Sequence, residues 1–131
     1  MKKKLLIIDD DEEMCFELAE ILKAEGYETE ISHNGLEGKE MILNNKYDLV
    51  LLDLKIPGLN GFGILKAIKD NNMKLNVIVL SGRPMAKELK KYAGNYNSEE
   101  EAALKLAESV INKPFDINQL IKRINELTNQ I

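Results

Sequence analysis

The chain has 131 residues, of which 44% are hydrophobic and 31% are charged, proportions that suit one ordinary globular domain with a single core. Its 18 basic and 22 acidic residues give a net charge of −4, which argues against DNA or an anionic membrane as the main partner. The single cysteine, Cys15, excludes an internal disulfide and suits a reducing cytoplasm, and no apolar run is long enough for a membrane span or a secretory signal.

The first half of the chain alternates short apolar runs with longer helical patterns. The run Leu5–Ile8 predicts a strand that is buried on both faces. A helix is predicted from about residue 12 to residue 25. Its apolar face is predicted to consist of Cys15, Leu18, Ile21 and Leu22. Residues 27–32 alternate as in a strand near the edge of a sheet, and Asn34 is expected to cap a second helix.

The second half continues the same alternation. Three further strands are predicted at residues 49–52, 77–80 and 109–111. Proline and glycine residues at positions 57–61 mark a loop before a third helix over residues 62–70. Pro84 suits the first turn of a fourth helix, and Asp116 is expected to cap the last one.

These segments form five successive βα units. Such alternation implies a parallel sheet with helices on both faces, because each parallel strand needs a crossover connection. The pattern therefore predicts a doubly wound α/β fold, and we expect one domain over residues 1–131.

Chemically useful side chains follow four of the predicted strands. In chain order they are Asp9 and Asp10, Asp53, Ser81 with Gly82, and Lys113. Ligands bind outside the carboxyl ends of parallel strands, so acids, a hydroxyl and a lysine are expected to converge at one edge. Each residue also has an ordinary reading: a helix cap for an acid, as we predict for Asp11, a turn for the serine and a surface charge for the lysine. The combination at four strand ends is what indicates a site.

The three aspartates would repel one another if they were close and ionised, and a hard divalent cation would remove that conflict. Mg²⁺ prefers oxygen ligands and takes one or two carboxylates. Asp53 is then the candidate nucleophile toward phosphorus, as in enzymes that form aspartyl phosphates. Mg²⁺, Lys113 and the Ser81 hydroxyl could hold the oxygens of the transferred group.

Five segments resemble, in order, the motifs of bacterial response-regulator receiver domains. They are Leu5–Asp11, Asp48–Gly58, Asn60-Gly61, Val79–Gly82 and Lys113–Phe115. The resemblance covers nearly the whole chain and implies a flavodoxin-like sheet of strand order 2-1-3-4-5. It also implies two-component signal transduction, in which a histidine kinase or a histidine phosphotransfer protein of a phosphorelay supplies the phosphoryl group. The chain would then be a phosphoprotein switch that promotes its own phosphorylation and dephosphorylation, not an enzyme with a separate substrate.

The resemblance assigns roles to individual residues. Asp53 would accept the phosphoryl group. The implied Mg²⁺ ligands are Asp9, mainly through bound water, together with Asp10, Asp53 and the backbone carbonyl of Lys55. The implied phosphoryl-binding and switch residues are Ser81, Gly82 and Lys113. A cis bond before Pro114 would aim the lysine inward.

Two features depart from the family pattern. Receivers usually carry an aromatic switch residue in the fifth strand, where this chain has Val110. The region of the fourth helix, between Lys87 and Ala107, is longer than usual by roughly three helical turns. We therefore expect an unusual output surface there, and a readout of phosphorylation through the Ser81 loop and this segment.

Two alternative functions remain open at this point. A pseudo-receiver would keep the fold as a protein-binding module without phosphorylation, and Val110 and the long segment before it slightly favour that reading. A haloacid-dehalogenase-type phosphatase also uses a strand-end aspartate and Mg²⁺, but it needs a second aspartate at the position of Lys55. For the receiver we expect a cytoplasmic monomer or weak dimer with a downstream protein target, and no binding of nucleic acid or membrane by this domain itself.

Overall fold

The computed structural model of the protein describes residues 2–82 and 102–129. The strands are β1 (Lys4–Ile8), β2 (Glu28–Ser32), β3 (Leu49–Asp53), β4 (Asn76–Ser81) and β5 (Ser109–Asn112). The helices given bounds in these ranges are α1 (Glu12–Ala24), α2 (Gly35–Asn44), α3 (Gly61–Asp70) and α6 (Ile117–Thr128). The predicted start of a fourth helix at Pro84, and most of the segment between Lys87 and Ala107, lie outside the described residues.

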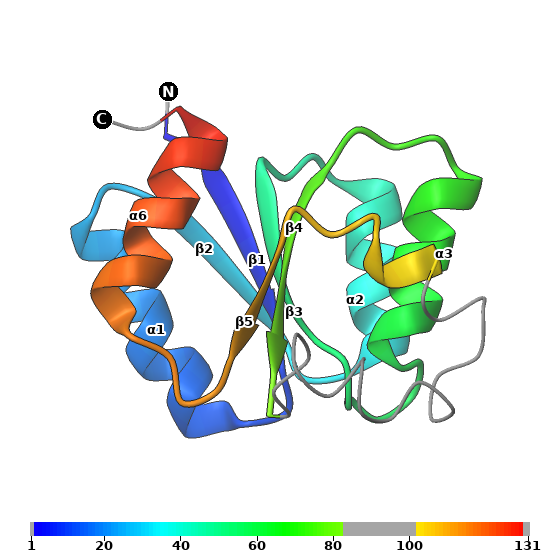
Figure 1. The fold of residues 1–131 in the computed structure, drawn as a ribbon, viewed down its shortest axis with the longest axis horizontal. Helices are drawn as coiled ribbons and strands as arrows, with labels where there is room; N and C mark the ends of the chain where they lie inside the picture. Colours follow the sequence, from blue (N-terminus) through cyan, green and yellow to red (C-terminus); the bar gives the residue numbers. More distant parts are fainter. Residues whose placement is uncertain (1, 83–101, 130–131) are drawn as a thin grey trace.

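The five strands are parallel and lie in the order β2-β1-β3-β4-β5. Figure 1 shows α1 and α6 on one face of the sheet and α2 and α3 on the other. The central strands are covered on both faces, which explains their continuous apolar runs, whereas the edge strand β2 carries Glu28 and Glu30. The predicted flavodoxin-like fold and its strand order are confirmed.

Two apolar clusters hold the central strands in place. Successive side chains of a strand point to opposite faces, so each strand contributes to both clusters. Toward α2 and α3, the strand residues are Leu6, Ile8, Val50, Leu52, Val77 and Val79. Toward α1 and α6, they are Leu5, Ile7, Leu49, Leu51, Ile78 and Leu80. Full burial of each such side chain contributes about 1.5–3 kcal/mol, so the ends of these strands are well-fixed points for a site.

Helix α1 shows where the predicted apolar face was right and where it was wrong. The residues that it buries are Cys15, Leu18, Ala19 and Leu22. Cys15 is therefore a core residue, as predicted. Ile21 is 38% exposed, so its predicted place on the buried face is wrong. Successive helical residues lie about 100° apart, which leaves Ile21 beyond the edge of the buried face and brings Ala19 onto it.

The helices begin at capping side chains, which also fix the loops at the carboxyl-end edge of the sheet. Asp11, Asn34 and Asp116 accept hydrogen bonds from backbone N–H groups of the first turns of α1, α2 and α6, as predicted. Helix α3 starts one residue earlier than predicted because Asn60 caps it.

The start of α2 is also packed against the loop that follows β3. The Gly35 amide donates to the Pro57 carbonyl at 2.8 Å. A Cβ at Gly35 would lie 1.6 Å from the Leu59 carbonyl oxygen, so a side chain cannot fit here.

Candidate functional site

Two aspartates lie side by side where the central strands β1 and β3 end. The strands pair in parallel register, so Asp9, which follows β1, neighbours Asp53, which ends β3. Asp9 is fully buried and Asp53 is 7% exposed, whereas Asp10 is exposed. One carboxylate oxygen from each of the three lies within 4.8 Å of the others. The fold therefore concentrates negative charge at one point of the carboxyl-end edge.

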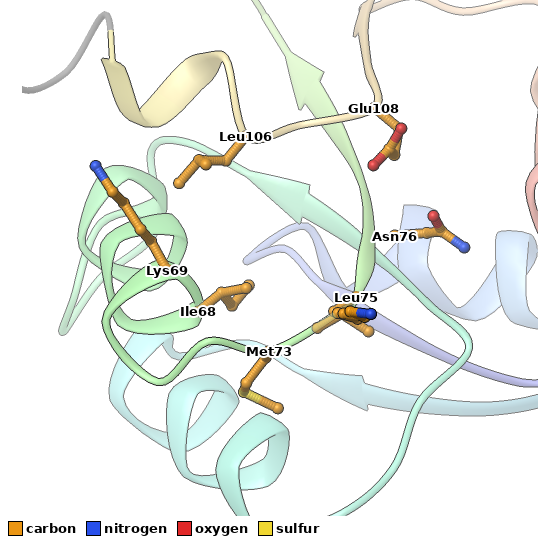
Figure 2. Close-up of a pocket in the computed structure, with 8 residues that line it drawn as sticks. Ile68, Lys69, Met73, Leu75, Asn76, Leu106 and Glu108 are labelled. Carbon is orange, nitrogen blue, oxygen red and sulfur yellow. The ribbon is translucent and has the colours of Figure 1, made fainter.

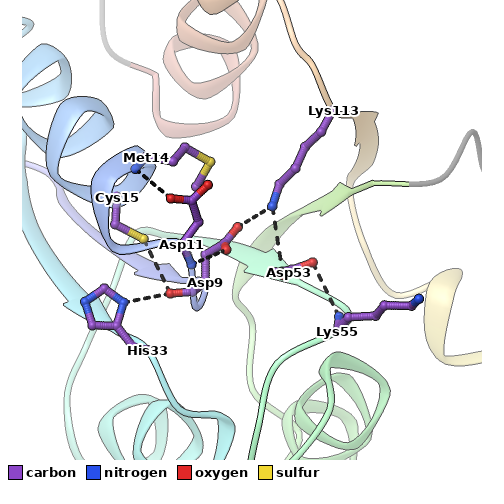
Figure 3. Close-up of polar contacts among 8 residues, drawn as sticks. All are labelled: Asp9, Asp11, Met14, Cys15, His33, Asp53, Lys55 and Lys113. Atoms are coloured by element: carbon purple, nitrogen blue, oxygen red, sulfur yellow. Dashed lines mark hydrogen bonds and ion pairs between the residues drawn. The ribbon is translucent and has the colours of Figure 1, made fainter.

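Lys113 brings one positive charge to these carboxylates from the connection between β5 and α6. Its Nζ atom lies 2.6 Å from Asp9 Oδ2 and 3.9 Å from Asp53 Oδ2. Figure 3 marks both contacts with dashed lines. The Lys113–Pro114 bond is cis, the isomer that the resemblance implies. The lysine thus pairs closely with Asp9 and only loosely with Asp53.

The surroundings of Asp53 and Lys113 shift both groups toward the protonated form. Burial raises the pKa of the Asp53 carboxyl and the charge of Asp9 raises it further, while the Lys113 ammonium opposes both effects. Burial alone would lower the pKa of Lys113, but the hydrogen bond and charge of Asp9 outweigh it, so that pKa is raised. Two buried carboxylates share one ammonium group, which leaves an excess of negative charge.

The donor set fits Mg²⁺. The cluster consists of carboxylate oxygens, the ligands that a hard divalent cation prefers, and it includes no thiolate or imidazole of the kind that zinc sites use. Three carboxylates converge here, and the Lys113 ammonium lies 2.6 Å from one of them and 3.9 Å from another. A metal cation would therefore be stabilised here in addition to the Lys113 ammonium.

Ser81 and Lys55 lie beside the two aspartates. Ser81 ends β4, next to β3, and is 4% exposed; its carbonyl accepts from the Lys113 backbone amide at 2.6 Å. The backbone amide of Lys55 donates to Asp53 Oδ1 at 3.4 Å, and the Lys55 side chain is exposed. The strands that carry or precede the predicted site residues are β1, β3, β4 and β5, and all four end at the same edge of the sheet.

Two predicted switch positions lie further out. Gly82 is exposed, and a Cβ there would meet no atom within 4 Å, so space alone does not require glycine. Val110 lies within β5 and is 38% exposed. The segment in which we expect the output change runs from Ser81 to Ala107 and lies mostly outside the described residues.

His33 lies at the same edge but is not among the residues predicted from the sequence. It follows β2, and its Nδ1 atom lies 2.8 Å from the Asp9 carbonyl oxygen (Figure 3). The signal that could have found it is its position directly after the second predicted strand, because that strand also ends at the carboxyl-end edge of the parallel sheet. It is also the single histidine of the chain.

Two open cavities lie at the opposite, amino-end edge of the sheet. Their volumes are about 430 and 420 Å³, and both are lined by the segment Met73–Leu75. Ile68, Lys69, Leu106 and Glu108 are among the residues that line the first cavity and that Figure 2 draws. Within residues 2–82 and 102–129, the grouping of three potential metal ligands occurs at the carboxyl-end edge and not here. Chemistry, not cavity size, therefore locates the candidate site.

Comparison with known proteins agrees with this geometry. The family model described as "Response regulator receiver domain" matches residues 5–125. The chain belongs to the response-regulator receiver family. Members of this family are phosphoacceptor switches of two-component systems and are not usually classed as enzymes. Histidine kinases or phosphotransfer proteins phosphorylate them.

Three similar proteins illustrate this membership. The receiver domain is 33% identical over 120 residues to sporulation initiation phosphotransferase F of Bacillus subtilis (strain 168), covering 92% of this chain and 89% of the relative. The Francisella response regulator 1452 receiver domain superposes with a TM-score of 0.83 at 27% identity, covering 98% of both chains. The response regulator TrrA of Thermotoga maritima, solved in complex with Mg²⁺ and BeF, gives a TM-score of 0.78 at 25% identity, covering 95% of this chain and 98% of that one.

The chain spans about half the length of several other curated relatives. In the described parts of this receiver domain, no helix has the length and apolar character needed to cross a membrane.

Proposed function

We propose that this receiver domain accepts a phosphoryl group on Asp53 in a Mg²⁺-dependent reaction. The observation that carries the proposal is the position of Asp53 at the end of the central strand β3. Its carboxylate is nearly buried, lies beside those of Asp9 and Asp10, and is 3.9 Å from the Lys113 ammonium. A nucleophile, cation ligands and a positive charge for the phosphoryl oxygens are thus close together.

Mg²⁺ would be held by Asp10, Asp53 and the backbone carbonyl of Lys55, with Asp9 beside them. When bound, the ion supplies the positive charge that lets these carboxylates and an incoming phosphoryl group occupy one site. The convergence of three carboxylates beside one ammonium group supports this assignment.

In the transfer, a carboxylate oxygen of Asp53 attacks the phosphorus of the donor. A bond forms between that oxygen and phosphorus, the bond from phosphorus to the donor nitrogen breaks, and the nitrogen keeps the electron pair. The Lys113 ammonium, which lies 3.9 Å from Asp53, would donate to the oxygens of the transferred group, and the Ser81 hydroxyl would be a second donor to them.

The remaining assignments follow from the same site. We propose that these residues promote both phosphorylation of Asp53 and later hydrolysis of the acyl phosphate, with a histidine kinase or phosphotransfer protein as the physiological donor. Residues 1–131 would form one receiver domain that acts on a protein target. The cytoplasm suits such a domain with its one buried thiol.

The test is phosphorylation of the full chain by a small-molecule phosphoryl donor with and without Mg²⁺, followed by intact-mass spectrometry. We expect one added phosphoryl group that requires Mg²⁺, is removed by hydroxylamine, and is absent from Asp53→Asn. Asp70→Asn, the same change at an exposed position at the end of α3, is the control and should react like the natural chain. A hydroxylamine-resistant phosphate, or full reaction of Asp53→Asn, would refute the proposal.

A further inference from the structure

We propose that His33 is a positioning residue that orients the peptide group between Asp9 and Asp10 and thereby sets the affinity of this edge for Mg²⁺. The inference rests on the proposed function, since it assumes that these aspartates bind the ion. His33 itself touches neither the ion nor the phosphoryl group in this assignment. It acts through the backbone of Asp9.

The hydrogen bond fixes the tautomer of His33. A carbonyl oxygen can only accept, so the 2.8 Å contact with Asp9 requires the proton on Nδ1 of the imidazole. In the neutral ring, Nε2 is then the acceptor. Figure 3 shows the ring reaching from the end of β2 toward the Asp9 carbonyl, on the side away from Lys113.

His33 completes the hydrogen bonding of a fully buried residue. The other polar atoms of Asp9 bond to Ser32 (amide, 3.1 Å), Asp11 (Oδ1, 3.0 Å) and Lys113 (Oδ2, 2.6 Å). The Asp9 amide makes the last backbone bond between β1 and β2. Its carbonyl lies beyond the ladder and takes its donors from side chains instead. These are His33 Nδ1 and, at 3.5 Å, Cys15 Sγ, whose thiol is a weak donor.

The carbonyl that His33 holds belongs to the peptide group between the two acidic residues. A peptide group is planar, so a hydrogen bond that fixes its oxygen also fixes the direction in which the chain continues to Asp10. Asp10 is exposed, and packing therefore does little to hold its carboxylate near that of Asp53. Because the three carboxylates must converge on one ion, a rotation of this peptide would weaken ion binding while leaving the apolar core intact.

Three substitutions at His33 separate positioning from a general structural role. The amide nitrogen of Asn occupies the place of imidazole Nδ1, whereas that of Gln reaches the place of Nε2. We therefore expect His33→Ala and His33→Gln to weaken Mg²⁺ binding roughly tenfold, and His33→Asn to keep it within about twofold, since loss of a group that orients a metal ligand typically costs 10- to 100-fold. The dissociation constant of Mg²⁺ is measured by titration calorimetry on the full chain.

Cys15→Ala is the matched control, because it removes the weaker donor to the same oxygen and leaves a hole in the core. We expect it to lower the melting temperature more than His33→Ala does and to change the Mg²⁺ dissociation constant less. Equal loss of Mg²⁺ affinity in the two variants would show a general loosening and overturn the inference.

The remaining outcomes are also decisive. If His33→Ala binds Mg²⁺ like the natural chain while Asp53→Ala does not bind it, the inference fails and the proposed function stands. If the natural chain itself does not bind Mg²⁺, both fail. Long-range proton–nitrogen NMR on the natural chain gives an answer that needs no variant: a proton on Nδ1 supports the inference, and a proton on Nε2 overturns it.

Discussion

At the carboxyl-end edge of the sheet two buried carboxylates share one lysine, whereas toward the amino-end edge the carboxylates of Asp48 and Glu30 each have close donors. Lys113 is 2.6 Å from Asp9 but 3.9 Å from Asp53. At the other edge, the backbone amide of Lys4 donates to the Asp48 carboxylate at 2.7 Å. The Lys4 ammonium lies 3.2 Å from Glu30, which also accepts a hydrogen bond from the Tyr47 hydroxyl.

The pKa directions of the two edges differ in the same way. Burial and the charge of Asp9 raise the pKa of Asp53, while the hydrogen bond from Tyr47 lowers that of Glu30. A carboxylate that the fold stabilises as an anion is a structural group. A carboxylate whose negative charge has no close counter-charge is stabilised by a bound cation or by loss of its charge. This difference separates the candidate site from an ordinary ion-pair cluster.

The largest expected effect comes from removing the shared lysine. Lys113→Met should slow phosphorylation of Asp53 by a small-molecule donor at least about 100-fold, since it removes a charge aimed at the transferred group. It should also lower the free energy of unfolding by about 3 kcal/mol, because the Asp9 carboxylate stays buried without its partner.

Lys74→Met makes the same change at an exposed residue of the amino-end edge and should alter neither quantity measurably. The rate is followed by mass spectrometry and the stability by urea unfolding. A phosphorylation rate for Lys113→Met within threefold of the natural chain would show that the two edges do not differ as described.

Most of the arrangement at the carboxyl-end edge can be predicted from the sequence, because local signals determine it. Asp11 and Asn34 act as caps within one helical turn, and parallel strands necessarily end at one edge, so the meeting of Asp9 and Asp53 could be expected. The close pairing of Lys113 with Asp9 rather than with Asp53 could not, because it depends on how a loop from the far end of the chain enters the site.

Other features depend on tertiary geometry that no local pattern contains. The bond from His33 to Asp9 exists because β2 and β1 pair in one particular register. The exposure of Ile21 depends on which angular range of α1 the sheet covers. The backbone of Gly35 touches a loop more than twenty positions further on, which spacing alone does not reveal.

A second effect, on stability and not on the phosphorylation rate, should separate a closely packed part of the carboxyl-end edge from an open part. Gly35→Ala should lower the free energy of unfolding by about 3 kcal/mol, since its Cβ would lie 1.6 Å from the Leu59 carbonyl oxygen and the loop must move. Gly82→Ala meets no atom within 4 Å and should raise stability by about 0.5 kcal/mol by restricting the unfolded chain. Urea unfolding of both variants checks this, and a loss of stability in Gly82→Ala would contradict the open space seen there.

The third prediction compares the loss of a carboxylate at each edge, without Mg²⁺. Asp53→Asn should raise the melting temperature by about 2–5 °C at neutral pH, the size expected for roughly 1 kcal/mol in a domain of this length. The folded-state pKa of Asp53 is raised, so its ionisation costs stability as the pH rises from the unfolded-state pKa through the folded one. The gain from Asp53→Asn should therefore be absent in acid and appear as the pH rises.

Asp48→Ala provides the opposite sign at the amino-end edge. It removes the acceptor for the Lys4 amide and should lower the melting temperature. Thermal unfolding between about pH 3 and pH 8 measures both variants, with the window chosen around ordinary carboxyl pKa values. Destabilisation by Asp53→Asn at neutral pH would show that Lys113 balances Asp53 fully, and the contrast between the edges would disappear.

The smallest expected effect concerns the hydroxyl of Tyr47. Tyr47→Phe should lower the free energy of unfolding by about 1 kcal/mol at neutral pH, the loss of one hydrogen bond to a charged acceptor, reduced because the Glu30 side chain is 40% exposed. The hydrogen bond from Tyr47 favours ionised Glu30 and lowers the pKa of Glu30 below the ordinary 4.5. The contribution of this bond to stability is therefore full above pH 4.5 and is lost as the pH falls through the folded-state pKa of Glu30. The difference in stability between Tyr47→Phe and the natural chain should therefore shrink below about pH 4.

Tyr27→Phe is the matched control, because the Tyr27 hydroxyl bonds to Asn125 and Thr128, which do not titrate. The loss of stability in Tyr27→Phe should therefore stay constant over the same pH range. Urea unfolding of the two variants is measured at several pH values. An equal, pH-independent loss of stability in both would mean that the contacts of Glu30 with Lys4 and Tyr47 do not depend on an ionised Glu30.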